Sequence, residues 1–181
     1  MSSLQFHTIQ GLVAGAELYP VIGDHAVPFS LGTVLIDLDH VIEYIRDMKC
    51  CDVRGLFTYA KLTELNLKKN FVVLSAFHTI ECFALTALLA SAYPPLWYVL
   101  AGMLFHVAAD IVNLRRLGRP RGRAYSLIEY VVRSRDPRTI TRMAALLRRD
   151  DVETRGVQRF EYWKQRWESC RARLEPGSGA P

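Results

Sequence analysis

The most constraining feature of this chain is a set of histidine and acidic residues inside its most apolar stretches. Residues 35–40 read Leu-Ile-Asp-Leu-Asp-His, residues 77–81 read Phe-His-Thr-Ile-Glu, and residues 105–110 read Phe-His-Val-Ala-Ala-Asp. Ionisable side chains in apolar surroundings cost free energy unless they are paired or bind a metal. Because imidazole and carboxylate are ligands that zinc, manganese and iron accept, the three stretches together indicate a metal site.

Charged residues are divided unevenly along the chain. Residues 1–114 contain six Lys and Arg and ten Asp and Glu, whereas residues 115–181 contain seventeen Lys and Arg and eight Asp and Glu. We therefore divide the chain into a membrane-embedded, metal-binding helical bundle (1–114), a basic amphipathic helical tail (115–175) and a disordered end (176–181) that is rich in Pro and Gly. None of the four cysteines forms a CxxC pair, so the sequence does not indicate a disulfide scaffold.

Four apolar segments predict membrane helices. Two of them, 71–93 and 94–114, are long enough to cross a bilayer core of roughly 30 Å, and Pro94-Pro95 between them predicts a tight helical hairpin. Segments 4–22 and 28–45 are weaker, and the second is either a full span or a re-entrant element. The first contains small residues such as Gly11 and Gly15, which permit close contact between membrane helices. The expected fold is an all-α membrane bundle of about four apolar helices.

Basic residues give the expected orientation in the membrane. The connection 46–70 and the tail are both rich in Lys and Arg, which favour the cytoplasmic side. Four spans then place both termini in the cytoplasm, so we expect a multi-pass protein of the cytoplasmic (inner) membrane.

The tail begins with a basic run, Arg115–Arg123, and ends with a predicted helix over 152–174. We interpret the run as an anchor against anionic lipid head groups, with recruitment of a phosphate-bearing substrate as the alternative. The aromatic stripe Phe160, Trp163 and Trp167 predicts packing or contact with the membrane surface. We expect no nucleic-acid partner, because no base-reading motif accompanies the charge.

This topology gathers the ionisable residues in one layer near the cytoplasmic surface. Reflection about Pro94-Pro95 places His78 and Asp110 at similar depth, and His106 lies one helical turn from Asp110 on the same face. The predicted metal ligands are His7, Asp37, His40, His78, His106 and Asp110, and the candidates for the catalytic base are Asp39 and Glu81. A structural hydrogen-bond network is the alternative interpretation of these side chains.

The spacing of two acidic residues sets a condition on the local structure. Asp37 and Asp39 point about 200° apart on a regular helix, because each residue turns the helix by about 100°. Both can reach one centre only if the helix begins or breaks there. Otherwise Asp39 orients a ligand instead of binding the metal.

These motifs resemble those of the YdjM-like membrane-bound metal-dependent hydrolases. The similarity lies in Asp37-Leu38-Asp39-His40, in His78-Thr79, in Gly102–Asp110 with the pattern G-x-x-x-H-x-x-x-D, and in His7 as an early histidine. It covers about residues 5–113. Ile36 stands where the family usually has Pro, and Ser75-Ala76-Phe77 stand where it usually has Arg-Gly. The resemblance implies a metal-dependent hydrolase in the membrane, and the family arginine is one that could bind a substrate phosphate.

We therefore expect a membrane-bound hydrolase that acts on a phosphoester or lipid-like substrate through metal-activated water. The expected cofactor is a divalent metal, zinc first, with manganese or iron as alternatives. The expected partners are membrane lipid and a phospholipid-like substrate that enters from the leaflet. Two alternatives are a non-catalytic membrane protein, with a structural metal site and a partner-binding basic tail, and a soluble helical bundle.

Overall fold

The fold is almost entirely helical in the part of the chain that the structure describes. The computed structural model describes residues 3–66, 72–116, 118, 123–141, 154, 157 and 160–174, but not the side chains of 3–7 and 171–174. The elements are α1 (Ser3–Ile22), η1 (Gly23–His25), α2 (Ala26–Leu35), α3 (Leu38–Met48), α4 (Val53–Asn66), β1 (Val73–Leu74), η2 (Ala76–His78), α5 (Ile80–Ala92), α6 (Leu96–Arg116), β2 (Arg123–Ala124), α7 (Leu127–Ser134) and α9 (Phe160–Leu174). The all-α class is confirmed. The predicted disordered end, 176–181, lies outside the described residues.

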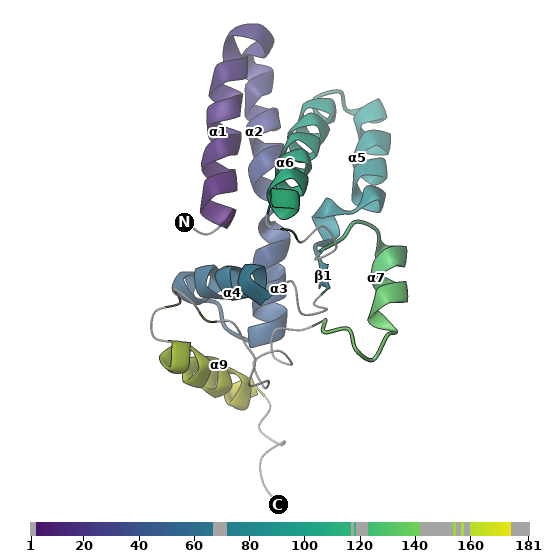
Figure 1. Cartoon of the computed structure of the whole chain (residues 1–181). Coiled ribbons are helices and arrows are strands. Elements are labelled where there is room, and N and C mark those ends of the chain that lie inside the picture. Colours follow the sequence, from purple (N-terminus) through teal and green to yellow (C-terminus); the bar gives the residue numbers. More distant parts are fainter. Residues whose placement is uncertain are drawn as a thin grey trace, which may run out of the picture.

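The helices form two layers, one above the other in Figure 1. In the upper layer, α1 and α2 form an antiparallel hairpin with η1 at its tip, α6 packs beside α2, and α5 packs beside α6. The hairpin predicted at Pro94-Pro95 is confirmed, because α5 and α6 end and begin on either side of it. In the lower layer, α3 packs against α4 and α9. The upper and lower layers meet where α2 passes into α3.

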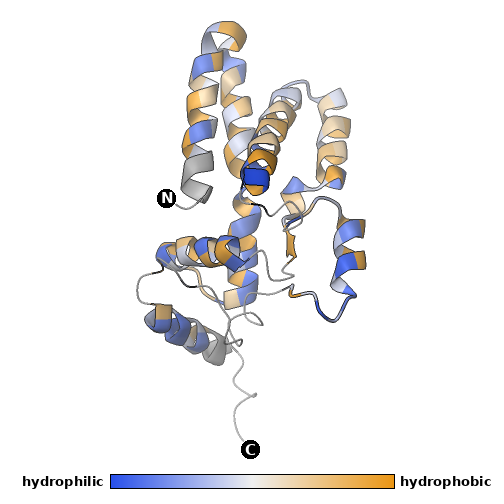
Figure 2. Cartoon of the chain, in the orientation of Figure 1, coloured by the Kyte–Doolittle hydropathy of each residue, from blue (hydrophilic) through white to orange (hydrophobic). Residues whose placement is uncertain are grey.

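Apolar side chains dominate the upper layer, as the orange residues on α1, α2, α5 and α6 show in Figure 2. Two helical stretches, Thr8–Met48 with the η1 turn inside it and Leu96–Arg116, are long and apolar enough to cross a membrane by length and composition. Only 33% and 28% of their most apolar windows are buried inside the protein. Val21 and Leu88 are 80% and 68% exposed. The upper layer therefore presents apolar surface to its surroundings.

The predicted helix over 71–93 is wrong in its first part. The chain forms the short strand β1 and the 3-10 turn η2 before α5 begins at Ile80. The Oγ1 atom of Thr79 accepts a hydrogen bond from the backbone N–H of Cys82, so Thr79 caps the helix where it starts. The 13 residues of α5 span about 20 Å, which is short of a hydrocarbon core of roughly 30 Å. His78 therefore lies on a turn and not within a spanning helix.

Glycines allow α2 and α6 to approach almost to backbone contact. A Cβ atom added to Gly32 would lie 2.2 Å from the backbone oxygen of Val99, and one added to Gly102 would lie 2.1 Å from that of Phe29. No real Cβ atom tolerates either distance, so only glycine fits at both positions. This reciprocal contact fixes how α2 and α6 lie against each other, and with it the place of the residues that follow α2.

Small residues also join α1 to α2. A Cβ atom added to Gly11 would lie 2.1 Å from Oγ1 of Thr33, and one added to Gly15 would lie 1.9 Å from Oγ of Ser30. The prediction that small residues of the first segment lie at a helix contact is confirmed.

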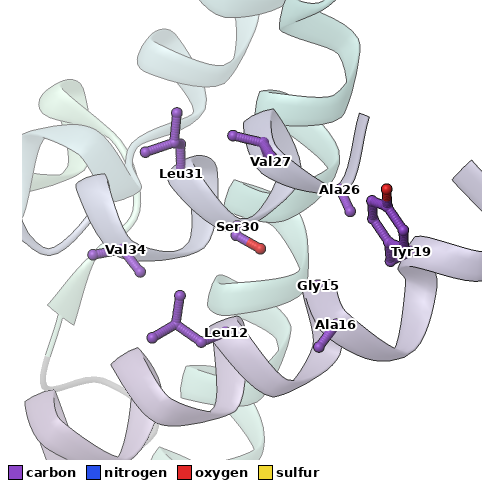
Figure 3. Close-up of a pocket in the computed structure, with 9 residues that line it drawn as sticks. All are labelled: Leu12, Gly15, Ala16, Tyr19, Ala26, Val27, Ser30, Leu31 and Val34. Carbon is purple, nitrogen blue, oxygen red and sulfur yellow. The ribbon is translucent and has the colours of Figure 1, made fainter. Parts of the chain in front are cut away.

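An open pocket of about 660 Å³ lies between the same two helices (Figure 3). It is lined by Leu12, Gly15, Ala16, Tyr19, Ala26, Val27, Ser30, Leu31 and Val34. Only Tyr19 and Ser30 bring polar side-chain atoms, so the pocket offers neither a charged group nor a strong metal ligand. The ionisable residues lie further along the chain, beyond the end of α2.

The helical path breaks between α2 and α3. The N–H of Asp37 donates to the carbonyl of Val34, and the N–H of His40 donates to the carbonyl of Asp37, so the backbone tightens to three-residue hydrogen bonds. Even so, Asp37 and Asp39 face opposite nitrogens of the His78 ring, Asp37 at Nε2 (3.9 Å) and Asp39 at Nδ1 (2.9 Å). The second alternative therefore holds, in which Asp39 orients a ligand instead of binding the metal.

Helix α3 buries a row of acidic residues. Asp39, Glu43 and Asp47 follow one another at four-residue intervals and are only 3–5% exposed, whereas Leu38 and Ile42 are 46% and 57% exposed. A helix on a water-exposed surface usually leaves its charges outside. In α3 the acidic row is buried beside Tyr44 and Met48, and it continues from the predicted metal site.

The basic tail is joined to the rest of the protein at two places. Strand β2 pairs in parallel with β1, with Val73 opposite Arg123 and Leu74 opposite Ala124. Trp167 of α9 is 1% exposed and packs in a hydrophobic cluster with Tyr44 of α3, which assigns this part of the aromatic stripe to packing. The predicted boundary at residue 114 is therefore crossed by structural contacts.

We predict that Gly102→Val destabilises the protein, because its Cβ would overlap the backbone of α2. The expected cost is about 2 kcal/mol, which lowers Tm by roughly 4–8 °C in a chain of this length. The measurement is thermal unfolding in detergent followed by tryptophan fluorescence. The matched control is Ala101→Val, since Ala101 is the exposed neighbour on the same helix. Equal Tm values for the two variants would contradict the proposed contact.

Candidate metal centre

Three buried side chains from separate elements form a group that could hold a metal ion. They are Asp37 at the α2–α3 break, His78 at the end of η2 and His106 in α6, and one ligand atom of each lies within 4.8 Å of the others. Nε2 of His106 lies 3.4 Å from Oδ1 of Asp37, and Nε2 of His78 lies 3.9 Å from the same oxygen. Their exposed fractions are 6%, 0% and 2%. Carboxylate and imidazole at this separation are ligands for zinc and related divalent metals.

Two further predicted residues border this group. Oδ2 of Asp110 lies 3.5 Å from Nε2 of His78 and 3.8 Å from Nε2 of His106. Nε2 of His40 lies 3.6 Å from Oδ1 of Asp37. The structure thus brings together five of the six predicted ligands, which come from parts of the chain separated by up to 73 positions. His7 lies in α1, but its side chain is outside the described residues.

Hydrogen bonds on the far side of the rings orient the two central histidines. Nδ1 of His78 lies 2.9 Å from Oδ2 of Asp39, and Nδ1 of His106 lies 2.9 Å from the backbone oxygen of Thr33. A carbonyl oxygen only accepts, so Nδ1 of His106 carries a proton, and Nε2 of the ring faces Asp37. At His78 the contact of Nδ1 with Asp39 likewise leaves Nε2 facing the group of Asp37, His78 and His106, which we call the centre. Such outer contacts are typical of histidines that bind metals.

The protonation of His78 suits a metal ligand. Complete burial lowers the pKa of its imidazole well below the ordinary value, and the positive charges of Arg123 and His40 act in the same direction. The ring is therefore neutral near pH 7, which is the state in which imidazole binds metals.

Two buried polar atoms at the centre have no hydrogen-bond partner among the described residues. They are Nε2 of His78 and Oδ2 of Asp37. An unsatisfied buried acceptor costs about 1–3 kcal/mol. A cation bound at the group of Asp37, His78 and His106 would satisfy Nε2 of His78, so the donor set fits a divalent metal.

The predicted catalytic bases have different surroundings. Asp39 is engaged with Nδ1 of His78 through one oxygen, so its position is that of a ligand-orienting residue. Glu81 is not brought to the centre by any hydrogen bond or ion pair of the described residues. Its Oε1 accepts hydrogen bonds from Oγ of Ser126 at 2.6 Å and from the N–H of Leu127 at 3.1 Å, so it joins the start of α5 to the start of α7.

Sequence reasoning missed three residues of the site. Nη1 of Arg123 donates to Oδ2 of Asp110, Oε2 of Glu43 lies 3.5 Å from Nδ1 of His40, and the carbonyl of Thr33 holds His106. The four-residue spacing of Asp39 and Glu43 was a signal for the second, because it repeats on one helix face. No sequence signal distinguishes Arg123 from the other arginines of the basic run.

Comparison of the chain with family models, with curated proteins and with solved structures found no match. The geometry of the site therefore carries the functional argument by itself.

We predict that Asp39→Asn weakens metal binding by roughly 10- to 100-fold, because the hydrogen bond that orients His78 loses its charged acceptor. The measurement is competition for zinc with a chelating indicator dye. Asp24→Asn is the matched control, since Asp24 is exposed at the η1 tip and the substitution removes the same charge. Unchanged affinity in Asp39→Asn would show that this carboxylate does not support the ligand.

Proposed function

We propose that this protein is a membrane-bound metal-dependent hydrolase that acts on a phosphoester substrate. The observation that carries the proposal is the buried group of Asp37, His78 and His106, with the rings of both histidines oriented from behind. The three motifs that resemble those of the YdjM-like hydrolases lie in the segments that meet at this group.

The surroundings of the site support a place in the inner membrane. The two long apolar stretches leave most of their apolar windows outside the protein interior. The site lies at the junction of this apolar layer with the more polar lower layer, which carries α4 and α9 (Figure 2). A multi-pass arrangement with both termini in the cytoplasm would put the junction near the inner leaflet, where an amphipathic substrate could reach it.

The residues of the centre divide into distinct tasks. Asp37, His78 and His106 would hold a divalent metal, zinc first, with manganese or iron as alternatives, and Asp110 and His40 lie close enough to complete the ligand set. Such a metal polarises a phosphoryl oxygen and lowers the pKa of water toward about 7. The Thr33 carbonyl and Asp39 keep the two imidazole rings in place.

The most exposed member of the group is His40. Its side chain is 19% exposed, whereas the other members of the group are almost fully buried. Nδ1 of His40 faces Oε2 of Glu43 at 3.5 Å, and its Nε2 faces Oδ1 of Asp37 at 3.6 Å. Glu43 therefore orients the His40 ring at the edge of the metal-binding group.

We predict that His78→Ala and Asp37→Ala lose bound metal, because each removes one of the three central ligands. Metal per protein is measured by mass spectrometry after purification in detergent, together with turnover of a chromogenic phosphodiester. His25→Ala is the matched control, since His25 lies at the hairpin tip and stacks on Tyr98 with ring centroids 4.3 Å apart. We expect about one metal or more per wild-type chain, the same in the control, and a loss of at least roughly 10-fold in both variants.

Three outcomes would bear on the proposal in different ways. Equal metal in all four proteins, or none in any, would end the metal hypothesis. Metal lost in the variants, with no turnover of any phosphodiester by the wild type, would favour a structural metal site in a non-catalytic membrane protein.

We predict that the protein stays with the membrane fraction after an alkaline carbonate wash and is extracted only by detergent, because its exposed apolar helices require lipid contact. The measurement is the distribution of the protein between pellet and supernatant, with a known peripheral membrane protein as the control. Recovery in the supernatant as a monodisperse protein without detergent would support the soluble-bundle alternative instead.

A further inference from the structure

A buried arginine from the basic tail stands against the metal-binding group. The side chain of Arg123 is only 13% exposed, and its Nη1 donates to Oδ2 of Asp110. Its backbone is fixed by the parallel pairing of β2 with β1, in which Arg123 lies opposite Val73. Arg133 also donates to the carbonyl of Arg123 at 3.3 Å. Strand pairing and these two contacts therefore hold the guanidinium of Arg123 against the metal-binding group.

The guanidinium shares its carboxylate with the metal-binding group. Oδ2 of Asp110, the acceptor for Arg123, also lies 3.5 Å from Nε2 of His78. A ligand bound at the group would therefore lie next to the arginine. A guanidinium has five N–H donors in a planar fork, and the contact with Asp110 uses one edge of it.

The second donor edge of the fork faces His40. Nη2 of Arg123 lies 3.4 Å from Nε2 of His40, the member of the group with the largest exposed side-chain fraction. An anion that replaced His40 as the partner of Nη2 would lie between the guanidinium and the metal-binding group. Arginine pairs with phosphate through two parallel hydrogen bonds, so phosphoryl oxygens match these donors.

We propose that Arg123 binds the anionic phosphoryl group of the substrate beside the metal centre and so determines specificity for phosphoesters over neutral esters. The inference rests on the proposed function and deepens it. Arg123 lies in the basic run that the sequence interpretation assigned to lipid head groups, but its burial and its contact with Asp110 separate it from a lipid anchor.

A purely structural role for Arg123 would have a different signature. If the arginine served only to hold Asp110, its removal would alter metal binding and would affect charged and neutral ligands alike. If it binds the substrate anion, its removal weakens anion binding selectively and leaves the metal in place. The comparison of an anionic with a neutral ligand on the same metal-loaded protein separates the two roles.

The experiment uses full-length protein in detergent, loaded with Co²⁺ so that ligand binding is followed in the visible spectrum. Inorganic phosphate and neutral imidazole are titrated into the wild type, Arg123→Gln, Arg123→Lys and Arg116→Gln. Arg116→Gln is the matched control, because Arg116 is exposed at the end of α6 and loses the same charge. Cobalt content is measured for each protein before the titration.

We expect phosphate affinity to fall roughly 10- to 100-fold in Arg123→Gln, while cobalt content and imidazole affinity stay within about 2-fold of the wild type and of Arg116→Gln. Arg123→Lys keeps the charge but not the planar fork, so its phosphate affinity falls between the two. On a soluble phosphodiester, Arg123→Gln should lose kcat/KM by a similar factor.

Phosphate affinity that is unchanged in cobalt-loaded Arg123→Gln would overturn the inference and leave the proposed metal site intact. Loss of cobalt from both Arg123 variants would assign the arginine to holding Asp110 and would also overturn it. A wild type that holds no cobalt would overturn the inference and the proposed function together, because the anion is expected to lie between the metal and the guanidinium.

Discussion

The architecture depends on the compensation of several carboxylates that are buried at one point of an apolar helical layer. Asp37, Asp39 and Asp110 are each 6% exposed or less, and a buried, uncompensated charge costs several kcal/mol. Compensation comes from imidazole rings and from the guanidinium of Arg123. Some of these pairs are local, such as His40–Glu43 and His106–Asp110, but the contacts of His78 and Arg123 join separate elements. The α2–α3 break, η2, α6 and β2 must therefore all be in place for the whole set of charges to be satisfied.

Three local features make this convergence possible. The reciprocal glycine contact between Gly32 and Gly102 lets α2 and α6 lie close enough for Asp37 to reach His106. The break after α2 lies at Asp37, and from it Asp37 and Asp39 reach the two opposite nitrogens of the His78 ring. The short pairing of β1 with β2 places Arg123 next to Asp110, at the edge of the metal-binding group. The regular helices form the scaffold, and the irregular segments between them position the ionisable side chains of the site.

The buried acidic row of α3 links the site to the rest of the protein. It begins at Asp39, behind His78, and continues through Glu43, behind His40, to Asp47. Tyr44 and Met48 of the same helix pack in the hydrophobic cluster that includes Trp167 of α9. Helix α3 therefore joins the metal-binding group to the lower layer.

The sequence by itself determined the all-α class, the hairpin at Pro94-Pro95 and the shared face of His106 and Asp110, because hydrophobic periodicity and helical spacing fix these features. It also pointed to His78, but it placed this residue inside a predicted helix over 71–93, where the structure has the η2 turn. It did not determine the contact of Glu81 with the start of α7, or the contact between Arg123 and Asp110. These depend on which distant segments meet. Arg123 is 83 positions from His40, and nothing local distinguishes it from its basic neighbours. Packing and strand pairing alone decided that Arg123 is the arginine that becomes buried. Its stabilising partner, Asp110, lies on another element and is not part of the local sequence.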